Sequence, residues 1–447
     1  MIARAFSARS LLQDRTLGRI ALGLVFLVPL FLFYGRAIAD GLISSTAILF
    51  LVRSRLQHDW SWVRRPWVPF AGALWLLILV ASVAAGPVHS MLEALVMIRL
   101  LLFCAALESW VLVSPQRRNW LGVVMAAMTV WLIFECWQQY LTGHNIAGFP
   151  RWPDGSLTGP FFKPRAGGTF LVLLFPGVMP FVLILIQSEK WRLRVAGGGV
   201  LAFLFITMVL IGQRMPSLLM LLGLAIGALI VRRFRIPVLV AFTAGIAVLL
   251  ALPVISPPTY GKLVVETAKN LSNFPASPYG LLYTRAVVMV IHHPWLGLGF
   301  DGFRDFCSNP IYFHGLRAYG IPTAIHQGLG GCNLHPHNYY LQIATAAGLS
   351  GLVLFLVMIG LWFIRVAGSL APRRAPQQAA LFLALCCNFW PIASTSSLFT
   401  LPTAGWVFLT VGWALAASSR RGATENLFDL KQSRVAGLAP SRIATPD

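Results

Sequence analysis

Side chains that could move a proton stand together in the stretch HPHN at residues 335–338. Imidazole accepts a proton near neutral pH with little adjustment, and an asparagine amide both donates and accepts hydrogen bonds. A hydrophobic run with Gly348 and Gly351 follows, and glycines one turn apart let a neighbouring helix approach closely. Three interpretations are open: a general base at a helix entrance, a two-histidine metal site, and a structural polar cluster. The metal interpretation lacks a nearby third ligand other than Cys332.

Two arginines lie where they could recognise an anion. Arg214 lies in IGQRMPS, a short connection between hydrophobic segments, and Arg285 lies in an amphipathic stretch that ends at Pro294. Guanidinium groups bind phosphate through paired, charge-assisted hydrogen bonds. For Arg285, a loop ion pair with Glu266 or Asp301 is the alternative. Arginines and a titratable histidine on one face would suit transfer from a diphosphate leaving group, which favours the general base.

The elements that must position these groups are hydrophobic. Of the 447 residues, 57% are hydrophobic and only 11% are charged. Apolar stretches of about 17 to 25 residues recur, each long enough to cross the hydrocarbon core of a bilayer. We therefore predict an all-α polytopic membrane protein with about 12 transmembrane helices. The predicted spans are residues 18–35, 37–53, 67–86, 91–113, 119–141, 168–187, 194–213, 215–231, 236–254, 341–364, 377–395 and 401–418.

The predicted organisation has four parts. Residues 1–254 hold transmembrane helices 1–9 with an outer loop at 142–167, residues 255–340 form a large outer loop between helices 9 and 10, residues 341–418 hold helices 10–12, and residues 419–447 form a cytoplasmic tail. Lysine and arginine are abundant in alternate loops, which by the positive-inside rule puts both termini in the cytoplasm. The net charge of +21 then reflects topology and attraction to membrane lipids, and no nucleic acid is expected as a partner.

Two further pairs are expected from position along the chain. Arg99 and Glu135 lie roughly 9–12 Å below the outer ends of the fourth and fifth predicted spans, at 1.5 Å per residue. Pairing lowers the cost of a charge in the bilayer, so we predict a structural ion pair between them. Cys307 and Cys332 both lie in the large outer loop, where an oxidising compartment would allow a disulfide. Two separate thiols are the alternative.

Taken together, these segments resemble the O-antigen ligase and O-antigen polymerase superfamily of bacterial polytopic membrane glycosyltransferases. The ligase pattern resembles His337-Asn338, nine residues, then Gly348-x-x-Gly351. The stretches TRAVVMVIHHPWLGLGFDGFRDF and GQRMPSLLML resemble the arginine-containing segments of the family. LTGPFFKPRAGGTFLVLLFP, which contains Lys163 and Arg165, resembles the glycine-rich entry to its central spans. The resemblance covers about residues 155–365.

The resemblance implies an inverting, metal-independent glycosyl transfer, without a cofactor, on the periplasmic face of the bacterial inner membrane. The donor would be a glycan linked to undecaprenyl diphosphate. The acceptor would be the lipid A-core oligosaccharide in a ligase, or another lipid-linked glycan in a polymerase. The implied roles are a catalytic base, two diphosphate-binding arginines and four supporting residues: His337 is the base, Arg214 and Arg285 bind the diphosphate, and His335, Asn338, Lys163 and Arg165 give support.

A twelve-helix transporter or lipid flippase is the alternative from another class of protein. Transporter folds usually consist of two similar halves. Here one large loop separates the ninth and tenth predicted spans, and no internal repeat is evident. The sequence therefore favours an O-antigen ligase first, an O-antigen or exopolysaccharide polymerase second, and a transporter third.

Overall fold

The computed structural model describes residues 2–418, without the side chains of residues 2–12, so the predicted tail at 419–447 lies outside the described residues. The described chain is all-α, and nine of its helices are long and apolar enough to cross a membrane. These nine are α1 (Ile2–Tyr34), α2 (Arg36–Leu56), α3 (Val68–Ala85), α4 (Val88–Ala106) with its π-helical extension η2 (Leu107–Val111), α5 (Pro115–Thr142), the continuous run α6 (Ala166–Leu173), η3 (Leu174–Val178) and α7 (Met179–Gln187), α8 (Trp191–Ile211), α10 (Arg235–Ile255) and α15 (Tyr339–Ala367). The protein is a polytopic membrane protein of the all-α class, as predicted.

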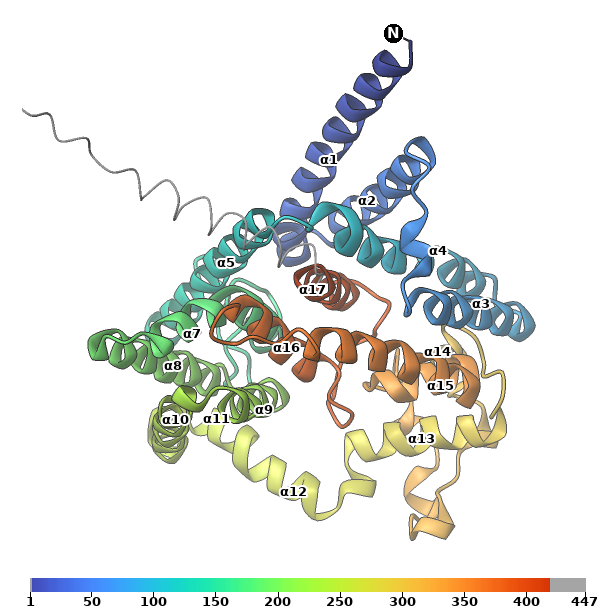
Figure 1. The fold of residues 1–447 in the computed structure, drawn as a ribbon. Coiled ribbons are helices and arrows are strands. Elements are labelled where there is room, and N and C mark those ends of the chain that lie inside the picture. The colour runs from blue at the N-terminus through green and yellow to red at the C-terminus, as the bar shows by residue number, and fades with distance from the viewer. Residues whose placement is uncertain (1, 419–447) are drawn as a thin grey trace, which may run out of the picture.

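Three shorter helices fall on the remaining predicted spans: α9 (Arg214–Ile230), α16 (Pro376–Asn388) and α17 (Thr403–Ala417). Each of the twelve predicted spans therefore contains a helix, but these three helices have only 17, 13 and 15 residues. The number twelve stays a prediction. Helix α17 lies near the centre of the bundle, where it packs against α1, α4, α5, α15 and α16 (Figure 1).

The predicted span at 377–395 is wrong in its second half. Helix α16 ends at Asn388, and residues 389–402 are irregular until α17 begins. Pro391 and the Ser/Thr-rich stretch at 394–397 account for this, because proline lacks an N–H and short polar side chains compete for backbone hydrogen bonds. Irregular backbone at membrane depth is tolerated only where protein or water satisfies it. We call residues 389–402 the broken segment.

The large loop is a folded unit rather than an open connection. It contains α11 (Pro257–Tyr260), η5 (Gly261–Val265), α12 (Glu266–Ser272), α13 (Pro278–His292) and α14 (Gly302–Phe306). Helices α12 and α13 follow one another along one side of the bundle, from α10 and α11 toward α15 (Figure 1). The part from α13 onward has its own small hydrophobic core, formed by Leu282, Ala286, Val288, Met289, Leu298, Phe303, Cys307 and Tyr312.

A tight turn fastens this loop to a kink in α15. Gly348 interrupts α15 with φ +67° and ψ −169°. Three backbone hydrogen bonds join the turn to the kink: Leu298 N donates to Thr345 O at 2.8 Å, Gly299 N to Ala346 O at 2.9 Å, and Leu349 N to Pro294 O at 2.6 Å. The kink frees carbonyls and an N–H inside α15, and the turn supplies partners for them.

Glycine is required on both sides of this contact. Gly297 has φ +75°, and a Cβ there would lie 2.5 Å from the Ala347 nitrogen. A Cβ at Gly348 would lie 2.6 Å from the Pro294 oxygen. Gly348 therefore admits a loop rather than the neighbouring helix that its spacing suggested. Gly351 faces α3, where Leu74 would be 3.6 Å from an added Cβ.

The predicted Arg99–Glu135 ion pair is wrong. Arg99 Nε donates to Asp40 Oδ1 of α2 at 2.9 Å, and Glu135 accepts a hydrogen bond from the Ile146 nitrogen at 3.1 Å. Helix α4 packs against α2 and α3, so Arg99 meets a carboxylate from α2 instead. Equal depth along two helices does not make the helices neighbours.

A second charged side chain, that of Glu108, lies in η2 at the C-terminal end of α4. Glu108 is 1% exposed, accepts a hydrogen bond from Trp67 Nε1 at 2.8 Å, and lies 3.5 Å from Arg65 and 3.2 Å from Arg365. These contacts tie η2 to the start of α3 and the end of α15. A buried carboxylate is tolerated here because two arginines and an indole N–H compensate its charge.

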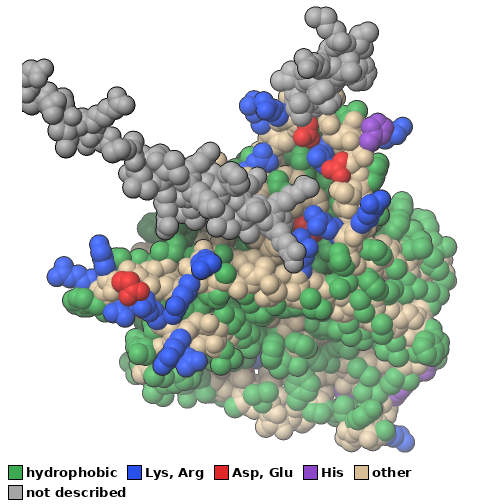
Figure 2. Space-filling model, in the orientation of Figure 1, with side chains coloured by type: hydrophobic (Ala, Val, Ile, Leu, Met, Phe, Trp, Pro, Cys, Tyr) green, Lys and Arg blue, Asp and Glu red, His purple; other side chains and the backbone are tan. Residues whose placement is uncertain are grey.

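The exterior of the helix bundle is largely apolar. Figure 2 shows hydrophobic side chains over much of the visible face, while lysines and arginines gather near the ends of α7, α8 and α10 and around α1 and α2. Helix α10 exposes Ile236, Leu239, Leu250 and Val254. Such a surface is expected where lipid rather than water is the solvent.

Candidate active site

Asn338 starts α15 and ties it to the broken segment. Its Oδ1 accepts hydrogen bonds from the nitrogens of Tyr340 and Leu341 at 3.0 and 3.1 Å, which is the geometry of a helix N-cap. Its Nδ2 donates to the Pro391 oxygen at 2.7 Å. The side chain is only 6% exposed, so Asn338 positions its neighbours and does not face a ligand.

His337 is held in a strained backbone conformation. Its φ is +54°, in the left-handed region that non-glycine residues rarely adopt. Thr395 stabilises this conformation, because its backbone nitrogen donates a hydrogen bond to the His337 oxygen at 2.8 Å. Strain of this kind costs about 1–3 kcal/mol and is concentrated at functional sites. The conformation therefore points to a function for His337.

The same partner fixes the tautomer of His337. Nδ1 lies 3.0 Å from the Thr395 carbonyl oxygen, which can only accept, so the proton of the neutral ring is on Nδ1. The lone pair is then on Nε2, which lies 3.3 Å from Asn333 Nδ2. A histidine with one nitrogen held by a carbonyl and the lone pair on the other is arranged to accept a proton.

The surroundings keep both histidines neutral near pH 7. Burial lowers the pKa of His337, and the hydrogen bond to Thr395 opposes this in part. Burial, and then the charge of His337, lower the pKa of His335 to about 4. The two rings are 4.3 Å apart, and Tyr279 lies edge-on to His337 at 6.0 Å. His335 Nε2 is buried without a hydrogen-bond partner among the described residues.

Gln342 completes the contact between α15 and the broken segment. Its Oε1 accepts from the Leu398 nitrogen and its Nε2 donates to Ser397 Oγ, both at 2.9 Å. Tyr340 Oη donates to the Phe389 oxygen at 2.6 Å. Sequence reasoning missed Gln342 and Thr395. The signal was present: Gln342 lies four residues after Asn338, on the same helix face, and opposite it stands a Ser/Thr-rich stretch inside a predicted span.

Arg285 is buried inside the large loop. It is 1% exposed, and its Nη1 and Nη2 donate to three carbonyl oxygens. These are Cys307 O at 2.7 Å, His326 O at 2.9 Å and Gly328 O at 2.9 Å. Its guanidinium also lies 4.2 Å from the centre of the Phe313 ring, and burial lowers its pKa. In this structure Arg285 organises the large loop, and its binding of a diphosphate stays a prediction.

The disulfide lies beside Arg285. Cys307 and Cys332 are bridged, with their Cα atoms 5.6 Å apart. Arg285 Nη1 approaches Cys332 Sγ at 3.5 Å in addition to the Cys307 oxygen. The guanidinium and the disulfide therefore fix the same part of the loop, immediately before the HPHN stretch.

Arg214 is engaged by an acidic residue. It is the first residue of α9, and its Nε donates to the Lys262 oxygen at 2.8 Å. Its guanidinium also pairs with Glu266 at the start of α12. Its side chain is 24% exposed, so an anion could reach it in exchange for Glu266. No hydrogen bond or ion pair links Arg214, Arg285 and His337 within the part of the chain that the structure describes.

Cations without carboxylate partners lie near Arg214. Arg36, Lys163 and Arg165, which we call the cation cluster, are exposed, and the described chain gives none of them an ion pair. Burial and the charge of Arg36 both lower the pKa of Arg165. Gln213 connects this cluster to α9, because it donates to the Pro164 oxygen at 2.6 Å and accepts from the Gly168 nitrogen at 3.3 Å.

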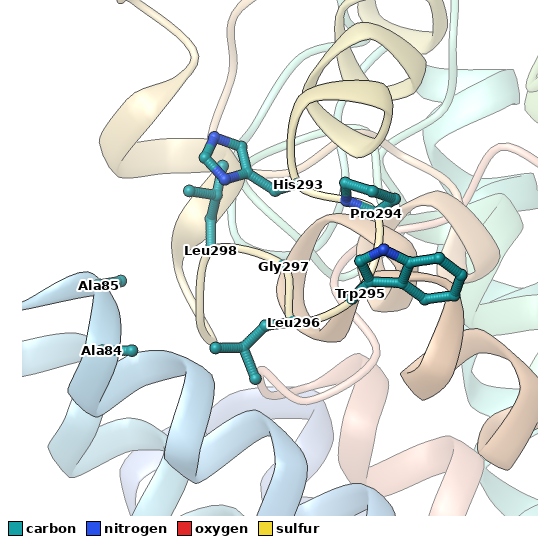
Figure 3. Close-up of a pocket in the computed structure, with 8 residues that line it drawn as sticks. All are labelled: Ala84, Ala85, His293, Pro294, Trp295, Leu296, Gly297 and Leu298. Carbon is teal, nitrogen blue, oxygen red and sulfur yellow. The ribbon is translucent and has the colours of Figure 1, made fainter.

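A cavity lies between α3 and the tight turn around Gly297 that fastens the large loop to α15. It has a volume of about 410 Å³ and is lined by Ala84, Ala85 and the residues from His293 to Leu298. Figure 3 shows Ala84 and Ala85 on one helix and the Pro294–Leu298 turn facing them. The lining is apolar except at His293, whose Nε2 is 2.8 Å from the Tyr312 hydroxyl. Its chemistry suits an apolar group rather than a diphosphate.

No metal site is evident in residues 2–418, where no three or more histidine, cysteine, aspartate or glutamate side chains are grouped as metal ligands. His335 and His337 instead contact each other, the broken segment and Asn333.

Comparison with known proteins places these features in a family. Residues 199–356 match the family model described as O-Antigen ligase. No curated protein matches the chain. The matched region holds Arg214, Arg285, the disulfide, the HPHN stretch and the glycine kink, whereas the cation cluster and the broken segment lie outside it. Residues 199–356 of this membrane protein therefore form an O-antigen ligase domain, which supports a place in the O-antigen ligase and polymerase superfamily.

Proposed function

We propose that the protein is an O-antigen ligase, which transfers a polysaccharide from undecaprenyl diphosphate to the lipid A-core oligosaccharide. The observation that carries this proposal is His337. Its strained backbone, its fixed tautomer and its low proton affinity suit a general base that is neutral at the working pH. The O-antigen ligase domain around it supports the reaction class.

The chemistry follows from the orientation of the imidazole. Nε2 of His337 takes the proton from an acceptor hydroxyl as its oxygen attacks the anomeric carbon of the donor sugar. The bond between that carbon and the diphosphate oxygen breaks on the opposite side, which inverts the configuration. Undecaprenyl diphosphate leaves with the bonding electrons, and the imidazolium returns its proton to water. No step needs a metal or a cofactor.

The leaving group needs positive charge. The cation cluster is suited to this, because Arg36, Lys163 and Arg165 are exposed and have no carboxylate partners among the described residues. Arg214 would join them when a phosphate replaces Glu266. Charge-assisted bonds from such groups stabilise the diphosphate most as it departs. The lipid tail of the donor would remain in the bilayer beside the apolar helices.

The orientation in the membrane completes the proposal. Both termini would be cytoplasmic and the large loop periplasmic, in the inner membrane of a bacterium, as the distribution of lysine and arginine indicates. The base, the loop and the cation cluster would then meet substrates on the periplasmic face.

The test is reconstitution of the purified protein with undecaprenyl-diphosphate glycan and lipid A-core. Glycan attached to lipid A-core supports a ligase. Lengthened lipid-linked glycan would show a polymerase, and movement of the donor across the bilayer without transfer would show a flippase. His337→Ala should lower transfer about 10²- to 10⁴-fold. His58→Ala is the matched control, since His58 is the other histidine with positive φ (+50°) and lies away from the site.

A further inference from the structure

We propose that Asn333 is a positioning residue that covers the lone pair of His337 in the resting enzyme and is displaced by the acceptor hydroxyl. This inference rests on the proposed role of His337 as the base. It assigns a function to a loop asparagine that lies just before the HPHN stretch.

The orientations of both side chains follow from their other contacts. The Thr395 carbonyl requires the proton of neutral His337 on Nδ1, so Nε2 can only accept. Asn333 Oδ1 accepts from the Leu334 nitrogen at 2.7 Å, which leaves the Nδ2 group as the side facing His337. The 3.3 Å contact between Nδ2 and Nε2 is therefore an N–H donated to the catalytic lone pair.

The loop holds Asn333 at this place. Cys332 precedes it and is bridged to Cys307, whose oxygen accepts from Arg285. Gly331 lies close against α13, where an added Cβ would be 3.0 Å from the Leu281 oxygen. The chain is thus anchored up to residue 332, while Asn333 itself is exposed and free to turn away.

The hydrogen bond between Asn333 Nδ2 and His337 Nε2 is weak enough to be exchanged for another. At 3.3 Å it is longer than the usual 2.9–3.0 Å of an N–H donor, so an acceptor hydroxyl can replace it at little cost. A donor to the lone pair also favours the neutral imidazole over the imidazolium. Until the acceptor arrives, Asn333 would keep water from being activated by His337 and so would limit hydrolysis of the donor.

The first measurement needs neither donor nor acceptor. Diethyl pyrocarbonate acylates neutral imidazole nitrogen, and mass spectrometry of the peptide around residues 335–338 gives the rate for His337. Asn333→Ala should speed acylation of His337 about 2- to 10-fold, the range for one neutral hydrogen bond. Asn273→Ala, an exposed asparagine of the same loop, should leave it unchanged. Equal rates in wild type and Asn333→Ala, with the disulfide intact, would overturn the contact.

A second variant distinguishes loss of the Asn333–His337 hydrogen bond from disorder of the loop. Asn333→Asp places a carboxylate beside His337 and favours the imidazolium, so the pH midpoint of acylation should move upward. A disordered loop would not produce that shift, and its absence would count against the proposal.

The last measurement concerns the role of the cover. In the reconstituted reaction, Asn333→Ala should raise free glycan released by hydrolysis relative to glycan transferred. An unchanged ratio would overturn the role as a cover. If His337→Ala instead kept full transfer activity, the proposed function would fail, while the acylation result for Asn333 would still stand.

Discussion

Replacement of Arg285 by lysine separates an organising role from a ligand-binding role. The guanidinium uses two nitrogens to hold three carbonyl oxygens, those of Cys307, His326 and Gly328. Lysine keeps the charge but offers a single nitrogen, which cannot occupy the positions of both Nη1 and Nη2. We therefore expect Arg285→Lys to loosen the large loop even when no substrate is present.

The magnitude follows from the lost partners. At least one buried carbonyl is left unpaired, at a cost of about 1–3 kcal/mol. If this cost falls on local opening of the loop, the opened population rises about 5- to 150-fold, since 1.4 kcal/mol is a factor of ten.

Hydrogen exchange measured by mass spectrometry reports that population directly. Amides between residues 307 and 333 should exchange faster in Arg285→Lys by the factor above, while amides of α8 and α15 stay unchanged. Arg317→Lys is the matched control, because Arg317 is an exposed arginine of the same loop. Its effect should stay within about twofold, as for most surface substitutions.

One result would refute this reasoning. If Arg285→Lys exchanged like wild type without donor, yet failed to bind or transfer the donor, Arg285 would act on the ligand and not on the loop. The buried guanidinium in the structure would then describe only one of its states.

Four further predictions follow from the same contacts. His337→Ala should lower turnover about 10²- to 10⁴-fold while binding of labelled donor is retained, and equal loss of binding would contradict its role as a base. Burial holds the pKa of His335 at about 4 in the folded state, against 6.5 in the unfolded state. The free energy of unfolding is therefore highest above pH 6.5 and falls as the pH drops toward 4, by at most about 3 kcal/mol. Thermal unfolding measured from pH 7.5 to 4.5 should show this fall, and His335→Gln should reduce it. Cys332→Ser opens a cross-link spanning 25 residues and should cost the loop about 3 kcal/mol, measurable as faster proteolysis. Gly297→Ala should lower thermal stability by at least ~2 kcal/mol, whereas Gly320→Ala, in the left-handed helical region (φ +72°, ψ 16°) with nothing within 4 Å, should cost only ~1 kcal/mol.

Hydrophobic runs predicted the fold class because lipid leaves an apolar chain few alternatives to helices. They failed at the broken segment. It still contains apolar residues such as Phe389, Ile392 and Leu398, so the predicted span extended into it, yet Asn338 and Gln342 of α15 satisfy its backbone and side-chain groups. Pro391 and the Ser/Thr-rich stretch at 394–397 mark the irregular backbone, but the residues that satisfy it lie about 50 positions away, and a hydrophobic run alone does not show them.

The charged residues show the same limitation. Arg99 was assigned to Glu135 by depth, but depth does not say which helices are adjacent, and Asp40 lies on the adjacent helix. Arg285 was assigned to a phosphate by its type and setting. A guanidinium has five donors, and loop carbonyls use them as readily as phosphate oxygens do. Only the fold distinguishes these partners.

His337 was proposed as the base from its own neighbours in the sequence, but the alignment of its imidazole could not be predicted in the same way. Both hydrogen bonds that fix it use the main chain of residue 395, once as donor and once as acceptor. Main-chain groups are free to do this only where the chain is not helical, since a helix would use them internally. The broken segment is therefore a requirement of the site: had α16 continued through residue 395, as its hydropathy predicted, His337 would lack the carbonyl that places its lone pair on Nε2.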